Sequence, residues 1–529
     1  MRKYQQKQIF ELLETLYEAQ AAGLYADCQD CAINIGEFIE TLAGEGTQTV
    51  ALLEQYCEMV FQASQGVVGE KKLRRHLQKI ETSVKTELRP SKTEIVFFPY
   101  QVSMWDSLES IYLAAAKDPQ CDAYVVPIPW FEKNRDGTFG EQKYDGERYP
   151  AHIPITDWNS YNLEERRPDA IFTHNPYDGN SYVSSVHPAY YSTALKRYTG
   201  CLVYVDYGLP FWMTRDAIDQ NLLPSFHFFD LAIVYSKEYA NALVHNLKRE
   251  LSPGSALLRV QESIKALGSP KFDAVVCAKR EEHPLPETWK AIIAKRKVIL
   301  FATSIAAVLK GGDDFVSSTR EFLEEFRNNE DIAIWWRPHP FSDSAFSSMR
   351  PQLREQYKEI VSTFISEGRG VYDDTPDLHR AIVWSDACYS DQSSVVLLYL
   401  ATGKPFTIRT FPAYHKDNGF TEDSNDFTPI LNAQIHNMQS ARGANIYNGN
   451  YVIWWHNFTR TDFANKFWYD DYWQRFSDFV LNMDKYPDAE KYRELKLKML
   501  RECFANADGT AGQKIYDCTK NKIIGDDLK

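Results

Sequence analysis

Apolar residues in the first part of the chain recur at three- and four-residue spacing, as they do along the buried face of an α-helix. Four stretches follow this pattern, separated by Gly23 and by the turn around Gly44 and Gly46, and they cover residues 7–21, 25–42, 47–64 and 71–85. We expect a helical module over residues 1–90 that packs with itself or joins two copies of the chain into a homo-oligomer. The alternative is a surface that docks onto a membrane or a partner protein.

The pattern changes after residue 90, where short apolar runs alternate with helical stretches. The runs cover residues 94–99, 123–127, 170–173, 202–205 and 231–235, and later 297–303, 331–337, 387–390 and 405–410. Strands that alternate with helices at this spacing predict doubly wound parallel sheets. We therefore expect an α/β protein with two Rossmann-type domains, over residues 91–285 and 286–440, followed by helices over residues 441–529.

The chain is acidic, with 59 Lys and Arg against 72 Asp and Glu and a formal charge of −13. This balance argues against a nucleic-acid partner, because a phosphate backbone selects basic surfaces. No apolar run reaches the roughly 20 residues of a membrane helix, and no signal peptide is visible. Nine scattered cysteines fit a reducing compartment. We expect a cytoplasmic protein, with peripheral contact at the inner face of the cell membrane as a further expectation.

The most informative stretch is the turn Asp391-Gln392-Ser393-Ser394, which lies between the strand at 387–390 and an apolar helical run at 395–400. Ligands of a parallel α/β sheet bind at the carboxyl ends of its strands, and a helix N-terminus offers free N–H groups to an anion. Ser393 and Ser394 are therefore candidate phosphate ligands. The alternative is that a serine here only caps the helix.

A second polar group ends the strand at 331–337, where the sequence reads Arg337-Pro338-His339-Pro340. A guanidinium can hold phosphate oxygens with two hydrogen bonds, and an imidazole can donate to a diphosphate or move a proton. Both strands belong to the same predicted sheet, so we expect this group to face the serine turn.

The first Rossmann-type domain also carries polar residues at its strand ends. His174 follows one strand, and Asp206-Tyr207-Gly208 follows another. The long polar segment between Trp130 and Asp157 is predicted to be a flap or an acceptor-binding loop, with a plain surface excursion as the alternative.

The pairing of a strand ending in Arg337-Pro338-His339-Pro340 with the strand, Ser390–Ser394 turn and helix that follow resembles the CDP-glycerol glycerophosphotransferase family, the polymerases and primases of teichoic acids. The resemblance implies a GT-B-like fold, in which two Rossmann-type domains face a cleft and C-terminal helices return across them. It implies that a CDP-activated alcohol binds in the second domain and that its phospho-alcohol passes to a hydroxyl of a polymer or lipid-linked acceptor.

Site residues follow from the same resemblance. His339 would act on the departing phosphate, and Asp391 would hold the turn or contact the ribose. The implied donor contacts are Arg337, Asp391, Ser393, Ser394, Lys271, Thr303, Gly419 and Phe420. No metal and no other cofactor is implied, and no carboxylate cluster in the sequence calls for one.

The chain departs from the family pattern at several positions. Tyr207 stands where the family has a histidine proposed as general base, and a phenol with a pKa near ~10 is a poor base at neutral pH. Asp206 and His174 are the substitutes, and the candidate catalytic residues are therefore His339, Asp206, Tyr207 and His174. Ser304 and Asn418 also replace family residues. Two alternatives therefore stay open: a nucleotide-sugar-dependent GT-B glycosyltransferase, and a catalytically weakened nucleotide-binding scaffold.

Overall fold

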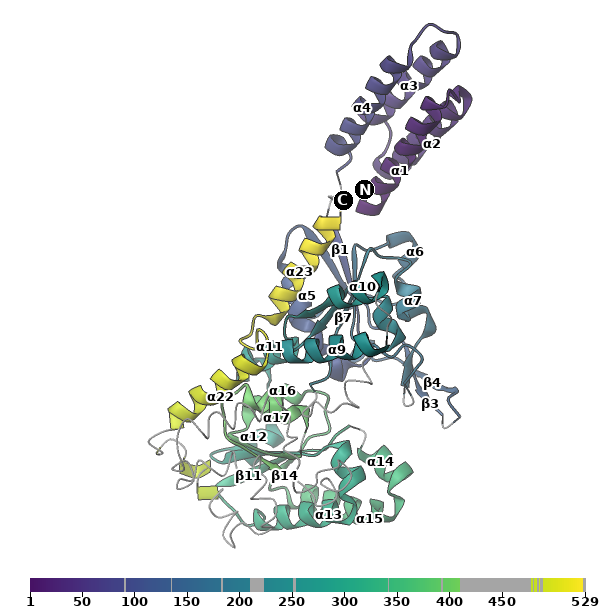
Figure 1. Cartoon of the computed structure of the whole chain (residues 1–529). Coiled ribbons are helices and arrows are strands. Elements are labelled where there is room, and N and C mark those ends of the chain that lie inside the picture. Colours follow the sequence, from purple (N-terminus) through teal and green to yellow (C-terminus); the bar gives the residue numbers. More distant parts are fainter. Residues whose placement is uncertain are drawn as a thin grey trace.

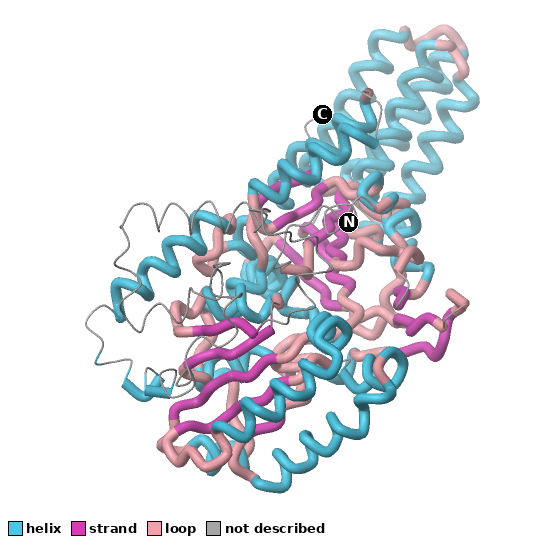
Figure 2. The backbone as a smooth tube through the Cα atoms, turned by 60° about the horizontal axis from the view of Figure 1, so that its bottom comes forward, coloured by secondary structure: helices cyan, strands magenta, loops and turns pink. Residues whose placement is uncertain are grey.

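The computed structural model describes residues 1–89, 92–134, 136–181, 184–209, 223–250, 254–340, 342–391, 393–409 and 477–526, the last range with gaps at 479, 483–484 and 486–488. Within these ranges the chain forms a helical module and two parallel sheets, and Figure 2 shows helices packed around both sheets. No described helix is long and apolar enough to cross a membrane.

The N-terminal module consists of four helices that extend away from the rest of the chain (Figure 1). They are α1 (Lys3–Ala21), α2 (Tyr25–Ala43), α3 (Gln48–Ser64) and α4 (Glu70–Glu87). Their apolar faces form a core of their own, separate from the other hydrophobic clusters. The base of the module touches the short helix α6 (Leu163–Arg166), where the Tyr4 hydroxyl donates to the Glu165 carbonyl at 2.8 Å. The four helices predicted from the apolar spacing are confirmed.

The first sheet has six parallel strands in the order β2-β1-β5-β7-β8-β9. The strands are β1 (Thr93–Phe98), β2 (Cys121–Val125), β5 (Ala170–Thr173), β7 (Cys201–Val205), β8 (Leu231–Val234) and β9 (Ile264–Ala266). We call the part of the chain that contains this sheet the first half, and the part that contains the second sheet the second half. The helices of the first half are α5 (Glu109–Lys117), α6 (Leu163–Arg166), α7 (Ser192–Leu195), α9 (Lys237–Glu250), α10 (Ser255–Ser263) and α11 (Pro270–Val276), with the 3-10 helix η1 (Val102–Ser107) after β1.

The first part of the segment predicted to be a long loop, residues 130–143, instead belongs to an antiparallel sheet. Strands β3 (Trp130–Lys133) and β4 (Phe139–Lys143) form a hairpin, and β3 also pairs with β6 (Ser184–Val186). Gly137 lies at the hairpin turn with φ +83°, a conformation that glycine adopts without strain. The small sheet follows the carboxyl ends of β2 and β5, so it lies at the rim of the first sheet.

The second sheet has five parallel strands in the order β12-β11-β10-β13-β14. The strands are β10 (Lys297–Ala302), β11 (Ile332–Arg337), β12 (Val371–Tyr372), β13 (Ala387–Asp391) and β14 (Phe406–Arg409). The helices are α12 (Glu287–Ile293), α13 (Ile305–Glu325), α14 (Ser342–Met349), α15 (Pro351–Glu367), α16 (Leu378–Trp384) and α17 (Ser394–Leu400).

Two helices near the far end of the sequence, α22 (Ala489–Cys503) and α23 (Ala511–Asp526), run past both halves (yellow in Figure 1). Helix α23 packs along α5, and the Tyr516 hydroxyl donates to Asp118 at 2.7 Å. The start of α23 is held by Asp273, whose carboxylate accepts the backbone N–H groups of Ala511 and Gly512 at 3.1 and 2.7 Å.

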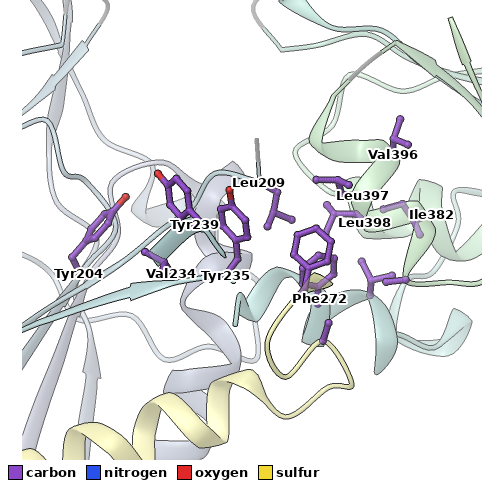
Figure 3. Packing of buried hydrophobic residues seen from close by; sticks show 14 of the residues in the cluster. Tyr204, Leu209, Val234, Tyr235, Tyr239, Phe272, Ile382, Val396, Leu397 and Leu398 are labelled. Carbon is purple, nitrogen blue, oxygen red and sulfur yellow. The ribbon is translucent and has the colours of Figure 1, made fainter. Parts of the chain in front are cut away.

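The two halves meet in a continuous hydrophobic core. Figure 3 shows Leu209 and Phe272 of the first half lying against Leu397 and Leu398 of α17, and all four belong to one buried cluster. Two parallel α/β sheets with a separate helical module confirm the GT-B-like fold class predicted from the sequence.

Candidate functional site

The candidate donor site lies at the carboxyl edge of the second sheet, where three strands end side by side. In the strand register Ala302 of β10 is opposite Arg337 of β11 on one side and Ser390 of β13 on the other. Because neighbouring strands lie about 5 Å apart, the residues that follow these three positions share one edge. The Arg-Pro-His-Pro group and the serine turn therefore flank the end of β10, as the sequence predicts.

Thr303, directly after β10, contributes a hydroxyl to this edge. Its backbone N–H donates to the Arg337 carbonyl at 3.1 Å, which fixes the residue between the two flanking strands. Its Oγ1 is buried and has no hydrogen-bond partner among the described residues. A buried hydroxyl without a partner is unfavourable, so Thr303 is suited to receive a polar ligand atom.

The two serines of the turn are partly accessible to solvent. Ser393 is the N-cap residue of α17, but its side chain makes no capping hydrogen bond, and both Ser393 and Ser394 are partly exposed. Among the described residues the Ser393 hydroxyl contacts Ser390 Oγ at 3.4 Å, which is long for a hydrogen bond. The alternative that Ser393 serves only to cap the helix is therefore not supported.

Asp391 holds the turn in place. Its Oδ1 lies 2.6 Å from Nε of Arg409, and its Oδ2 accepts the Ser304 N–H at 2.7 Å. The side chain is 1% exposed. Of the two roles expected for Asp391, the structure supports the first, because both carboxylate oxygens already have partners and neither faces outward to a ribose.

Arg337 requires a correction. The prediction that it grips donor phosphates is not supported, because its guanidinium is buried and turned inward. Nη1 donates to Asp373 at 2.8 Å and Nη2 to the Thr375 carbonyl at 2.6 Å. A buried guanidinium needs such partners, and here they fix the segment that leads into α16. Arg337 thus shapes the edge of the sheet.

His339 is partly exposed next to Arg337. Burial, reinforced by the charge of Arg337, lowers the pKa of the imidazole to about 4. The ring is therefore neutral at physiological pH in this structure. A neutral imidazole can form a hydrogen bond with a phosphate, but it carries no charge that would neutralise the departing phosphate.

His174, one of the two substitutes for the missing histidine base, is enclosed at the carboxyl edge of the first sheet. It is 0% exposed, its Nε2 accepts the Tyr100 N–H at 3.3 Å, and its Nδ1 contacts the Ser107 hydroxyl at 3.0 Å. Desolvation by burial lowers its pKa to about 3. Because both ring nitrogens have partners inside the protein, we correct the prediction: His174 is a structural residue that ties η1 to the sheet.

The other two first-half candidates differ from each other. Burial raises the pKa of Tyr207 well above 10, so the phenol is unsuited to take a proton. Its prediction as a catalytic group is therefore not supported. Asp206 is partly exposed, its Oδ1 accepts the Gly208 N–H at 2.8 Å, and desolvation raises its pKa to about 6. Asp206 remains a candidate proton acceptor.

Lys271 also lies elsewhere than predicted. Its Nζ is 2.5 Å from Oδ1 of Asp106, and Oδ2 of the same carboxylate lies 3.0 Å from Nε2 of His379 in α16. The lysine is thus engaged within the protein, so its assignment as a donor contact is corrected. Asp106 and His379 were not among the residues predicted from the sequence. The available signal for Asp106 was that it follows the end of a predicted strand, whereas His379 lies at the start of α16 without a motif of its own.

Two predicted contacts, Gly419 and Phe420, lie outside the described residues. Among the described residues there is no group of three or more His, Cys, Asp or Glu side chains that could hold a metal ion.

No family model matches the chain, and no curated protein matches it. Several solved structures do. The chain is similar to the wall teichoic acid polymerase TagF. The identity is 16%, the match covers 90% of this chain and 98% of that chain, and the TM-score is 0.42. The UDP co-structure of MnaA from S. aureus matches with 13% identity over 82% of this chain and 97% of that chain, with a TM-score of 0.42.

A UDP-N-acetylglucosamine 2-epimerase from Listeria monocytogenes gives the same values of identity, coverage and TM-score as MnaA. Because these TM-scores are low, the fold described above rests on the strand order and packing of this chain, and the site rests on its own residues.

Proposed function

We propose that this chain is a transferase that moves a phospho-alcohol, such as glycerol phosphate, from a CDP-activated donor to an acceptor hydroxyl during synthesis of a teichoic-acid-like polymer. The observation that carries the proposal is the hydroxyl-lined edge of the second sheet. There, Thr303 Oγ1, which is buried and has no partner among the described residues, and the partly exposed Ser393 and Ser394 follow neighbouring strands. The resemblance of the surrounding motifs supplies the substrate class.

The donor diphosphate would be held by hydrogen bonds. Ser393 and Ser394 offer hydroxyl and backbone N–H groups, and Thr303 offers its hydroxyl. The neutral His339 lies at the same edge of the sheet. Preorganised donors of this kind stabilise charge that develops in a transition state, and they are effective in a site shielded from water. Arg337 and Asp391 support these groups from within the protein.

The reaction would be an in-line displacement at phosphorus. The acceptor oxygen forms a bond to the β-phosphorus of the donor while the bond from that phosphorus to the bridging oxygen breaks. CMP leaves with the electron pair, and the acceptor proton passes to a base. Enzymes accelerate such reactions mainly by positioning and electrostatic stabilisation. Asp206 is one candidate base.

Thermal unfolding with a panel of nucleotides tests this proposal. CDP-glycerol or CDP-ribitol should raise the melting temperature most, because a ligand at 100 times its Kd adds about 2.7 kcal/mol of stability. CMP release from the stabilising donor is then measured with polyol acceptors. A larger shift with UDP- or GDP-sugars would favour a glycosyltransferase. Stabilisation without any CMP release would favour a nucleotide-binding scaffold.

A further inference from the structure

The contact between the two halves contains a buried set of ionisable side chains. Asp106 lies in η1, just beyond the end of β1 in the first half, and His379 lies in α16 of the second half. Oδ2 of Asp106 and Nε2 of His379 are 3.0 Å apart, and Lys271 of α11 contacts Oδ1 at 2.5 Å. The side chains of all three are between 10% and 13% exposed.

The hydrogen-bond pattern fixes which nitrogen of His379 carries a proton. Burial alone would raise the pKa of Asp106, but the charge of Lys271 and the hydrogen bond from His379 hold it far below its usual range. An ionised carboxylate only accepts, so Nε2 carries the hydrogen. In the neutral ring Nδ1 then holds the lone pair. Nδ1 is buried and has no hydrogen-bond partner among the described residues.

The neighbouring charged groups are otherwise engaged. His283, whose ring centroid is 6.4 Å from that of His379, lies with Nδ1 3.1 Å from Asp377, and Arg380 lies 3.3 Å from the same carboxylate. His174 is the other imidazole near Lys271, and both of its nitrogens have partners. Within the described residues at this contact, His379 is the one imidazole that combines a carboxylate partner with an unpartnered ring nitrogen.

An imidazole that is oriented by a carboxylate on one nitrogen, and whose other nitrogen has no partner among the described residues, has the arrangement of a general base. His379 is also close in sequence to a residue at the candidate donor site. It lies four residues after Thr375, whose carbonyl accepts a hydrogen bond from Arg337 at the carboxyl edge of the second sheet. We infer that His379 is a catalytic residue that takes the proton of the acceptor hydroxyl, and that Asp106 is its positioning residue. This inference rests on the proposed transferase function and supplies the base that the chain lacks at Tyr207.

The proton balance is complete within this step. As the acceptor oxygen bonds to the β-phosphorus and CMP leaves with the electron pair of the broken bond, the acceptor proton moves to Nδ1. The imidazolium that forms is stabilised through Nε2–H by Asp106. Since the two residues come from different halves, this base is assembled only while the halves are in contact.

The test compares His379→Gln, His379→Ala and Asp106→Asn with the unchanged chain, using CDP-glycerol as donor and glycerol, ribitol and methyl glucoside as acceptor probes. Loss of a general base lowers kcat by about 10²–10⁴-fold. Both His379 variants should show that loss while the Kd for CDP-glycerol stays the same. Free imidazole should restore part of the activity of His379→Ala, which a purely structural role would not allow.

His283→Ala is the matched control, since it removes a neighbouring imidazole that has its own carboxylate partner, and it should keep kcat. His379→Gln retains an N–H for Asp106, so its melting temperature should stay near that of the unchanged chain. Normal kcat in both His379 variants together with a large loss in Asp206→Asn would assign the base to Asp206 and overturn the inference. Loss of activity without imidazole rescue would also overturn it. If the unchanged chain neither binds CDP-glycerol nor releases CMP, the proposed function itself fails.

Discussion

The guanidinium of Arg409 lies 2.6 Å from the carboxylate of Asp391, and the two side chains are 2% and 1% exposed. The residues are opposite each other in the register of β14 and β13. Asp391 also accepts the Ser304 N–H at the end of β10. One carboxylate therefore ties three adjacent strand ends together directly before the serine turn.

Asp391→Ala should strongly destabilise the protein, because it leaves the Arg409 cation buried without this partner. Removing one member of a buried pair costs about 3–5 kcal/mol. Urea unfolding measures the loss. Asp343→Ala is the control, since its pair with Arg354 is largely exposed and should contribute less than ~1 kcal/mol. Equal losses in the two variants would contradict the structural role of Asp391.

Replacing Ser393 and Ser394 together by alanine should weaken binding of CDP-glycerol while leaving the melting temperature nearly unchanged. Each lost hydrogen bond to a charged phosphate is worth about 1.5–3 kcal/mol, so Kd should rise by at least about tenfold. Calorimetric titration measures it. Ser385→Ala is the contrast: its buried hydroxyl bonds the Ile382 carbonyl and Tyr399. That variant should melt earlier and bind the donor normally.

Asp206 should make stability fall as pH rises. Its pKa is about 6 in the folded chain and about 3.9 in an unfolded one, so the folded state holds the proton more tightly. The stabilisation is present below about pH 4 and is lost as pH rises through 6, by roughly 3 kcal/mol. Asp206→Asn should remove this component. The difference between the two unfolding free energies, measured from pH 4.5 to 8, should therefore change with pH, and a constant difference would refute the assignment.

Gly512→Ala should destabilise the first half. A Cβ at this position would come within 2.5 Å of the Ser110 carbonyl carbon in α5, so α23 must shift away. Overpacking of this kind costs about 1–3 kcal/mol. Gly36→Ala in α2 is the matched control, because its Cβ meets nothing within 4 Å. In a helix interior that change should instead add about 0.5–1 kcal/mol. Thermal unfolding of both variants measures the contrast.

The elements that the sequence predicts well are those with a strong local pattern. The apolar run at 332–337 is a buried strand, and the four N-terminal helices follow their three- and four-residue spacing. The hairpin β3–β4 was predictable in principle, because Asp136-Gly137 is a turn signal between two strands. Its strands have only four and five residues, and neither Trp130–Lys133 nor Phe139–Lys143 shows apolar and polar residues in alternation.

The sequence predicted where the candidate site lies in the fold better than it predicted the contacts of the individual side chains. Ser393, Ser394 and Thr303 gather at one sheet edge because parallel strands share their carboxyl ends. The side chains of Arg337 and Lys271 bind carboxylates within the protein, and a local sequence pattern could not predict this. Their partners, Asp373 and Asp106, are 36 and 165 positions away in the sequence. The pair formed by Asp106 and His379 spans 273 positions, so only the folded chain brings it together.

The docking of α23 on α5 has a consequence for how the protein is made. Asp118 and Tyr516 are 398 positions apart in the chain. During translation the first sheet emerges from the ribosome long before the helix that covers α5 exists. The side of α5 that α23 covers in the folded protein is therefore exposed until α23 has been synthesised. Nascent chains of this protein should depend on chaperones until that stage of translation.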